Sequence, residues 1–458
     1  MVTSPELECD QGVRCEMVSN NSSTGLSPGG GVSSDESDSY ASPLQAAVLV
    51  GVLIIVCAFS FIDLQLLALM ADPIKRALSL SDTALGSLQG AATYLSMCIG
   101  MFIVGPQIDK RDRLTMLGWA GMGWSVFTAL SAVSTGFWSL FICRACVGFS
   151  EAALFPVTYS LITDLYRPAA RPTAFLGYFA VANVVDGLSL YLVGILIGRL
   201  DNGSPLLRLA PWREAFLVLS VPGFAVSAML LLMREPSRHS SDKENVIDRS
   251  ESIRHYLAKN GAVFWALSGC MFFALIGWYA YMFWMPTLLG RITGLIPAVA
   301  GKRFGLLIST GPIVGVILAG LTMRYLRPRL GHSTQLRIFQ SGIVGTAALL
   351  PWMLMAKTEN ALLVHWLTCC IFVYFAVPLA PNILSHVAPA HIRGRLFAFY
   401  QLAITLPGVV GPPAVGSLSD SIFTGPRGLL LALAAVCIGC SVIAPLLAIY
   451  LGRQLARR

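Results

Sequence analysis

Twelve apolar stretches alternate with short polar segments after residue 43. A helix rises about 1.5 Å per residue, so about 20 apolar residues are enough to cross the hydrocarbon core of a bilayer. The pattern therefore predicts an all-α membrane protein with twelve transmembrane helices. The predicted spans are 44–71, 85–106, 114–133, 138–162, 172–198, 212–233, 261–289, 304–325, 338–356, 360–385, 396–418 and 428–451.

One longer polar stretch, 234–260, separates the first six spans from the last six. The chain before the first span is rich in Ser, Gly, Asp and Glu and cannot bury a core, so we expect it to be disordered. Four parts follow from this pattern: a disordered cytoplasmic tail (1–42), an N-terminal six-helix bundle (43–233), a cytoplasmic linker (234–260) and a C-terminal six-helix bundle (261–458).

Lys and Arg residues set the expected orientation. If the N-terminus is inside, the inner loops and the C-terminal tail carry twice as many Lys and Arg residues as the outer loops. Positive residues concentrate on the cytoplasmic side. We therefore expect a multi-pass protein of the cell (inner) membrane, with both termini in the cytoplasm.

Composition agrees with a membrane protein and argues against other classes. Charged residues make up 12% of the chain and hydrophobic residues 55%, whereas a soluble domain has about a quarter charged residues. The net charge of +8 comes from short loops and not from a stripe, so we expect no nucleic-acid partner. The 11 cysteines are scattered without the spacing of metal ligands, and we expect no metal site and no cofactor.

Four ionisable residues interrupt the apolar spans of the first half: Asp63, Arg144, Glu151 and Asp186. Charge inside a membrane is costly and usually marks a functional path. Counting residues from the span ends places Asp63 about 13 Å and Arg144 about 10 Å below the outer surface, so an ion pair between them is possible. Glu151 and Asp186 both lie about 20 Å deep, near the midplane. Arg144 and Glu151 are two helical turns apart and share one face.

A carboxylate beside an arginine, in a cavity that alternates between wet and dry, can be protonated in one state and ion-paired in the other. These residues therefore predict a proton switch, although a buried Asp–Arg pair can also serve only to fix helix register. The second half has no acidic residue inside a predicted span. Its polar candidates are His365, which we interpret as a tolerated interfacial residue, and His386.

Aromatic residues of the seventh span could line an apolar part of a substrate cavity, or could instead face lipid. Tyr279 and Trp284 are the two we assign to the cavity, together with Arg144, Glu151 and Asp186. Arg144 could then meet an anionic head group.

The loop after the second span reads Gly-Pro-Gln-Ile-Asp-Lys-Arg-Asp-Arg from Gly105 to Arg113. It resembles the major facilitator superfamily signature G-x-x-x-D-R-x-x-R, with Lys110 in place of the first Arg. In that superfamily the loop latches the two bundles in the outward-open state. The resemblance implies a cytoplasmic gate motif made of Gly105, Asp109, Lys110 and Arg113. The corresponding loop after span eight lacks the Asp.

Further segments match one branch of that superfamily: 63–65, 73–75, 80–83, 88–90, 124–125, 144–152, 389–393 and 411–420. In these segments the chain resembles the spinster branch, whose members move lysolipids and sphingolipid-like molecules. The resemblance implies that Asp63, Arg144 and Glu151 couple protons to transport. One departure is Leu64, where the family usually has an Arg directly after the Asp.

We therefore expect a proton-coupled secondary active transporter that works by alternating access. The expected substrate is an amphipathic anion such as a lysophospholipid or a sphingolipid-like molecule, and we expect a monomer. Two alternatives remain open: a proton symporter of a small organic anion, and a transport-inactive membrane sensor. We do not expect an enzyme or an ATP-driven pump, because no histidine has an Asp four or five residues on and there is no Walker loop.

Overall fold

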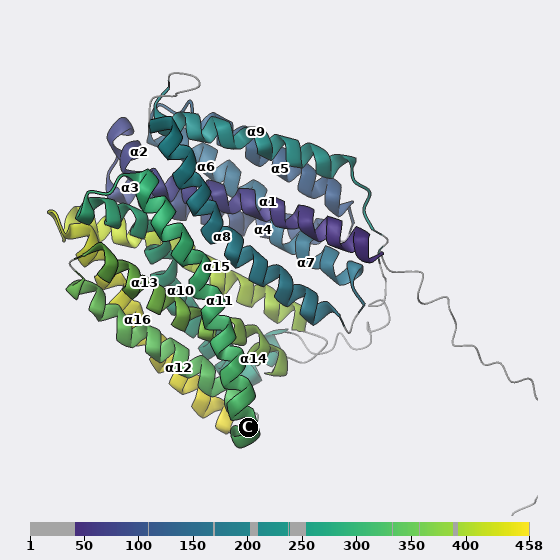
Figure 1. Cartoon of the computed structure of the whole chain (residues 1–458). Helices are drawn as coiled ribbons and strands as arrows, with labels where there is room; N and C mark the ends of the chain where they lie inside the picture. The colour runs from purple at the N-terminus through teal and green to yellow at the C-terminus, as the bar shows by residue number, and fades with distance from the viewer. Residues whose placement is uncertain are drawn as a thin grey trace, which may run out of the picture. The chain divides into compact units, whose positions relative to one another are not determined.

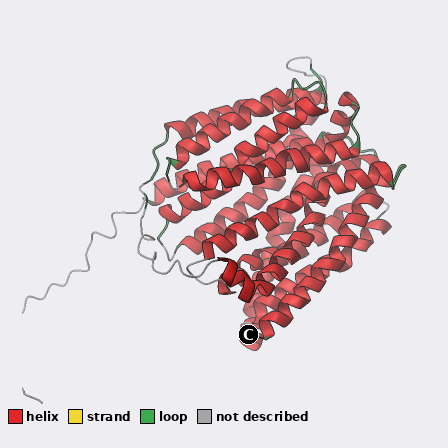
Figure 2. Ribbon diagram, turned by 180° about the vertical axis from the view of Figure 1, so that it is seen from behind, coloured by secondary structure: helices red, strands yellow, loops and turns green. Residues whose placement is uncertain are grey.

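A computed structural model of the chain describes residues 42–108, 110–167, 170–201, 209–236, 238, 253–331, 333–356, 358–387 and 393–457. These residues form helices joined by short connections, without a strand among them (Figure 2). Apart from Ser42, which caps the first helix, the predicted N-terminal tail lies outside the described residues. The predicted bounds of the two bundles and the linker stay predictions.

The first half of the described chain, 42–236, contains ten helical segments (Figure 1). They are α1 (Pro43–Leu69), α2 (Ala71–Leu78), α3 (Asp82–Ser87), the π-helix η2 (Leu88–Leu95), α4 (Ser96–Ile108), α5 (Arg113–Ser131), α6 (Phe137–Glu151), α7 (Leu154–Leu165) and α8 (Arg171–Asp201), followed by α9 (Pro211–Leu232). α3, η2 and α4 together form the second predicted span, and α6 and α7 form the fourth.

The second half, 253–457, begins inside the predicted linker. Its segments are α10 (Ile253–Thr293), α11 (Pro297–Leu330), α12 (Ser333–Leu349), the 3-10 helix η3 (Leu350–Met355), α13 (Glu359–Ala376), the 3-10 helix η4 (Val377–Leu379), α14 (Ala380–Val387), α15 (Arg393–Ser421) and α16 (Gly428–Ala456).

Eleven helices among the described residues are long and apolar enough to cross a membrane. They match eleven of the twelve predicted spans. The twelfth, α5, is a helix at the predicted place, but its glycines, tryptophans and hydroxyl residues lower its mean hydropathy. It packs against α9 and α6 within the first half. The predicted fold of twelve membrane helices, six in each bundle, is therefore confirmed.

Large apolar side chains also cover the outside of the helices. In a soluble protein such a surface would be an aggregation hazard, whereas in a bilayer it faces lipid tails. Examples that are more than half exposed are Phe102, Trp119, Trp138, Leu232, Trp265, Tyr325 and Val442.

The fourth span is not one continuous helix. α6 ends at Glu151 and α7 begins at Leu154. Pro156 explains the break, because it has no N–H to bond the carbonyl four residues earlier. In the first turn of α7 that missing N–H is tolerated.

The two halves meet along a long interface. α8 packs along α11 (Figure 1), and α15 packs against α3 and η2. At the α8–α11 crossing a Cβ on Gly187 would lie 2.6 Å from the Gly305 carbonyl oxygen, so two glycines allow the backbones to touch. These contacts run from mid-depth, where the Ser309 hydroxyl donates to the Val184 carbonyl (3.2 Å), to the end of the spans that carries α2. We call that end the α2 face; it is the predicted outer face.

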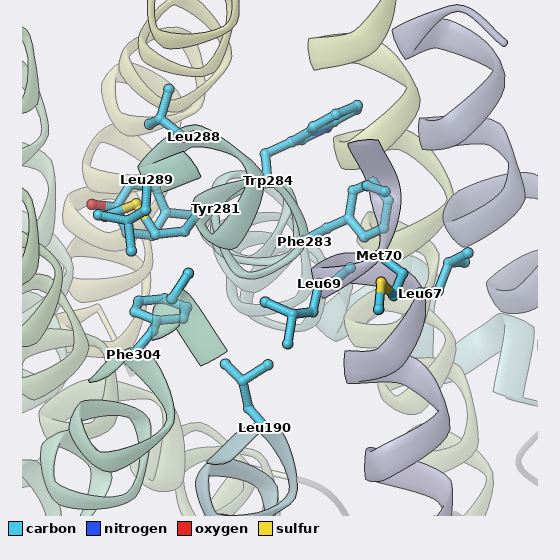
Figure 3. Packing of buried hydrophobic residues seen from close by; sticks show 14 of the residues in the cluster. Leu67, Leu69, Met70, Leu190, Tyr281, Phe283, Trp284, Leu288, Leu289 and Phe304 are labelled. Carbon is cyan, nitrogen blue, oxygen red and sulfur yellow. The ribbon is translucent and has the colours of Figure 1, made fainter. Parts of the chain in front are cut away.

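A hydrophobic core joins the halves near the α2 face. Its side chains come from α1, α8, α10 and α11, and Figure 3 shows them packed together in one cluster. Because both halves contribute, burying these groups stabilises the closure of this side of the molecule. The labelled members are Leu67, Leu69, Met70, Leu190, Tyr281, Phe283, Trp284, Leu288, Leu289 and Phe304.

Candidate functional site

An ion pair lies in the middle of the first half. The Arg144 guanidinium of α6 donates from Nη1 to Asp63 Oδ2 of α1 at 2.6 Å. The Thr128 hydroxyl of α5 donates to the other carboxylate oxygen at 3.2 Å. Both charged side chains are enclosed, with 0% and 2% of their surfaces exposed. The ion pair between Asp63 and Arg144, which their estimated depths allowed, is thus present in the structure.

The ion pair with Asp63 does not use all the hydrogen-bond donors of Arg144. Its Nε and Nη2 atoms are buried and have no hydrogen-bond partner within the described part of the chain. Guanidinium has five N–H groups arranged for bidentate binding of an anionic group. Arg144 therefore retains donors for a second acceptor, but in this conformation it is walled off and presents none of them to a cavity.

Glu151 is the last residue of α6 and is held by α1. The Ser60 hydroxyl donates to Glu151 Oε1 at 2.8 Å. Arg144 and Glu151 both lie on the buried stripe of α6, as their seven-residue spacing predicts. That stripe also contains Gly148.

Asp186 of α8 is held by α1 as well. Gln65 Nε2 donates to Asp186 Oδ1 at 2.8 Å. α1 therefore binds three charged residues of two other helices, through Ser60, Asp63 and Gln65. A movement of α1 would change the surroundings of all three.

Sequence reasoning missed Ser60 and Thr128, and it used Gln65 only as a mark of family resemblance. The signal for Ser60 and Gln65 was present, because both are polar residues close to Asp63 in an otherwise apolar helix. Thr128 could not be assigned, since hydroxyl residues in membrane helices usually bond their own backbone.

The helix that carries Arg144 and Glu151 packs directly on η2. A Cβ on Gly148 would lie 2.9 Å from Thr93 Cα and would overlap the Thr93 carbonyl. π-helical turns are rare and often occur at functional sites. The residue after Thr93, Tyr94, stacks edge-on against Tyr279 of α10, with ring centroids 5.0 Å apart. η2 thus contacts both the charged helix and the opposite half.

The two aromatic residues assigned to the cavity lie in different surroundings. Tyr279 is partly buried in its contact with Tyr94. Trp284 is fully enclosed, and its Nε1 donates to the Pro412 carbonyl of α15 at 2.9 Å. In this conformation Trp284 therefore packs α10 against α15.

His365 is buried, at 2% exposure, and the interpretation of an interfacial residue was wrong. Its Nε2 lies 3.0 Å from the Leu349 carbonyl, which can only accept, so this nitrogen carries the proton. Nδ1 then accepts from the Tyr281 hydroxyl at 2.8 Å. Both ring nitrogens are used in holding α13 to α10 and α12. His386 is exposed near the end of α14.

The predicted gate motif lies at the end of the spans opposite the α2 face. Asp109 is outside the described residues, Gly105 faces open space and Lys110 is exposed. Arg113 pairs with Asp164 of α7 at 2.6 Å and with Glu235 after α9. These partners belong to the first half, so a latch to the second half stays a prediction.

The neighbouring Asp112 caps α5. Its Oδ1 accepts from the Thr115 backbone N–H at 2.6 Å. Burial by itself would raise the pKa of the Asp112 carboxyl, but the hydrogen bonds from Thr115 outweigh it and hold the pKa below its ordinary value. The cap fixes where α5 begins, directly before Arg113.

We expect Arg113→Gln to lower the thermal midpoint of the purified protein by several degrees, because it leaves Asp164 and Glu235 without their shared cation. Losing one partner of a buried ion pair costs about 3–5 kcal/mol, and partial exposure of both acids reduces this cost. Lys110→Gln is the matched control, since Lys110 is exposed and makes no ion pair within the described residues. Equal midpoints for the two variants would contradict the assignment.

Comparison with known proteins agrees with this architecture. The family model described as Major Facilitator Superfamily matches residues 53–412. A protein named MFS-type efflux pump from Mycolicibacterium smegmatis is 24% identical over 399 residues, covering 86% of this chain and 89% of the relative. Protein spinster homolog 3 from Danio rerio is 24% identical over 409 residues, covering 82% and 77%.

A relative with a different name has the same percentage identity. A protein named Probable galactarate/D-glucarate transporter from Escherichia coli K12 is 24% identical over 428 residues, covering 86% of this chain and 91% of the relative. Among solved structures, a bacterial homolog of the human lysosomal transporter Spinster, in an inward-facing and unoccupied conformation, aligns with a TM-score of 0.75. It is 20% identical and covers 90% of this chain and 99% of that structure, so it shows the shared fold. The chain is a multi-pass integral membrane protein and belongs to the Major Facilitator Superfamily of transporters.

Proposed function

We propose that the protein is a proton-coupled secondary active transporter that works by alternating access and moves an amphipathic anion such as a lysophospholipid or a sphingolipid-like molecule. The observation that carries the proposal is the enclosed Asp63–Arg144 pair, in which two nitrogens of Arg144 have no partner among the described residues. A charge pair at this depth is costly to maintain without a use.

The coupling step follows from the chemistry of the pair. Protonation of Asp63 removes the negative charge that holds Arg144 in place. The guanidinium, with Nε and Nη2 already unpartnered, is then free to bind an anionic head group. When the proton leaves, Asp63 again competes for Arg144 and favours release of the head group.

Glu151 and Asp186 would also take part in the mechanism. Each is held by one neutral donor of α1, Ser60 or Gln65, and neither has a cation partner within the described residues. A carboxyl group that is bonded to a neutral donor can change its protonation state without breaking an ion pair. We propose that Glu151 shares in proton coupling and that Asp186 lines the substrate path with Tyr279 and Trp284.

The alternating movement would separate the halves at the α2 face and bring them together at the opposite end. In the second state, Asp109, Lys110 and Arg113 would latch the halves, as the resemblance implies. With the N-terminus in the cytoplasm, the present conformation faces inward. We propose that the protein acts as a monomer in the cell (inner) membrane.

Flux measurements in proteoliposomes test the proposal. We expect a labelled lysophospholipid to cross only in vesicles that contain the protein, at a rate that changes by about tenfold when a pH gradient is imposed. A panel of lysolipids, sphingoid bases and small organic acids identifies the substrate class. Absence of flux for every compound, in protein shown to be folded, would favour a transport-inactive sensor.

A small organic anion is the second candidate substrate. The similarity to a named galactarate/D-glucarate transporter favours it, because that relative matches over 86% of this chain. The similarity to the spinster relative favours the lipid. Faster gradient-driven flux of a sugar diacid than of any lysolipid would decide for the small anion.

A further inference from the structure

A charged network closes the α2 face. Arg291, near the end of α10, donates to Asp72 of α2 and to Asp82 at the start of α3. Its Nη2 lies 2.7 Å from Asp72 Oδ1 and from Asp82 Oδ1, and its Nη1 lies 2.7 Å from Asp82 Oδ2. One arginine of the second half thus binds two carboxylates of the first half.

Asp82 has donors from both halves. Its side chain is 3% exposed and accepts from Arg291, from Lys75 Nζ at 2.5 Å and from the Ser419 hydroxyl at 3.1 Å. Arg291 and Ser419 belong to the second half, on α10 and α15. Lys75 belongs to α2, in the same half as Asp82 itself.

The second half in turn contributes a carboxylate that binds the first half. Asp420, near the end of α15, accepts from the backbone N–H groups of Asp82 and Thr83 at 3.1 and 2.7 Å and from the Thr83 hydroxyl at 2.7 Å. These N–H groups are the free donors at the start of α3, where a negative charge is favourable. Each half therefore inserts a charged group into the other.

We propose that Asp82 is the shared carboxylate of a latch on the α2 face, with Arg291 as its partner only when that face is closed and Lys75 as its permanent partner. When the halves separate, Arg291, Ser419 and Asp420 leave with the second half. Lys75 moves with Asp82 and keeps it paired. The latch can open without leaving an enclosed carboxylate uncompensated, which would be costly.

Release of Arg291 from Asp82 should cost little free energy, because its side chain is accessible to water. Its side chain is 23% exposed and forms part of the wall of a cleft of about 350 Å³, which Asp72, Arg76, Thr287 and Gly290 also line. Water in this cleft can solvate the guanidinium as it leaves Asp82. The remaining partner, Asp72, is 28% exposed and is similarly accessible to water.

Two substitutions at Asp82's partners should therefore have opposite effects. Arg291→Gln removes an interaction present only in the closed state, so it favours opening. Lys75→Gln removes the cation that stays with Asp82 after opening, while Arg291 still neutralises Asp82 in the closed state, so it favours closure. A simple loss of folding would not produce effects of opposite sign.

The experiment measures the distance across the α2 face in the full-length protein. Spin labels attached through unnatural amino acids at Ala77 and Thr424, both exposed at this face, leave the native cysteines unused. Distances are recorded in lipid nanodiscs without substrate and without a pH gradient. The inference rests on alternating access, but under these conditions a wrong substrate or absent proton coupling would not affect the result.

We expect Arg291→Gln to raise the population with the longer distance by about fivefold relative to the wild type. Lys75→Gln in the otherwise native protein should lower it, and Asp420→Asn added to Arg291→Gln should raise it further. Arg303→Gln is the matched control, because Arg303 pairs with Glu359 inside the second half at the same face, and it should leave the distance unchanged. An unchanged distribution in Arg291→Gln, or the same direction of shift for Lys75→Gln, would overturn the latch.

Discussion

Asp63→Asn is expected to abolish the dependence of transport on a pH gradient and to lower the stability of the protein. Asparagine keeps the shape and one acceptor of the side chain but carries neither a proton to exchange nor a negative charge. Arg144, with none of its surface exposed, is then left as an uncompensated cation. Losing one partner of a buried ion pair costs about 3–5 kcal/mol. Gradient-driven flux in proteoliposomes and the thermal midpoint measure the two effects.

Two further variants separate coupling from stability. Asp63→Asn combined with Arg144→Gln removes both charges, so the thermal midpoint should recover while gradient-driven flux remains absent. Asp201→Asn is the control for the substitution itself, because Asp201 is exposed at the end of α8. Gradient-driven flux that persists in Asp63→Asn would remove Asp63 from the mechanism.

Gly148→Val is expected to be strongly damaging although it changes no charge. Three Thr93 backbone atoms of η2 lie against the position that its Cβ would occupy, and a backbone cannot rotate away as a side chain can. α6 must then move off η2. Overpacking typically costs about 1–3 kcal/mol, and here it would also displace Arg144, one turn earlier on the same face. Both the thermal midpoint and transport should fall.

Gly51→Val is the matched control for this prediction. Gly51 lies in α1, in the same bundle, and no atom lies within 4 Å of the position of its Cβ. The control should therefore behave as the wild type in both assays. If Gly51→Val and Gly148→Val lowered the midpoint equally, the contact between α6 and η2 would not be the cause.

Sequence pattern was sufficient for features that depend on one helix at a time. Apolar run length located all twelve spans, because crossing a bilayer sets a minimum length that few other structures require. Counting residues from the span ends placed Asp63 and Arg144 at similar depths, which allowed their ion pair to be predicted. This works because the rise per residue of a helix is nearly constant. Pro156 also carried a readable signal for the break before α7, which the run of apolar residues concealed.

Features that depend on how helices face each other were not predictable in this way. Arg291 and Asp82 are 209 residues apart, and their contact depends on the relative position of the halves. The same holds for His365, whose burial comes from Tyr281 and the Leu349 carbonyl and not from its own helix. The π-helical turn of η2, against which Gly148 packs, has no simple sequence signature.

The break between α6 and α7 divides the fourth span into two helices that are anchored separately. α6 is tied to α1 by the Asp63–Arg144 pair, while α7 is tied to the start of α5 by Asp164 and Arg113. Between Glu151 and Leu154 no continuous helical ladder transmits force from one anchor to the other. In the proposed mechanism, release of Arg144 from Asp63 can therefore tilt α6 while the far end of α7 stays fixed, with Ala152 and Ala153 as the hinge.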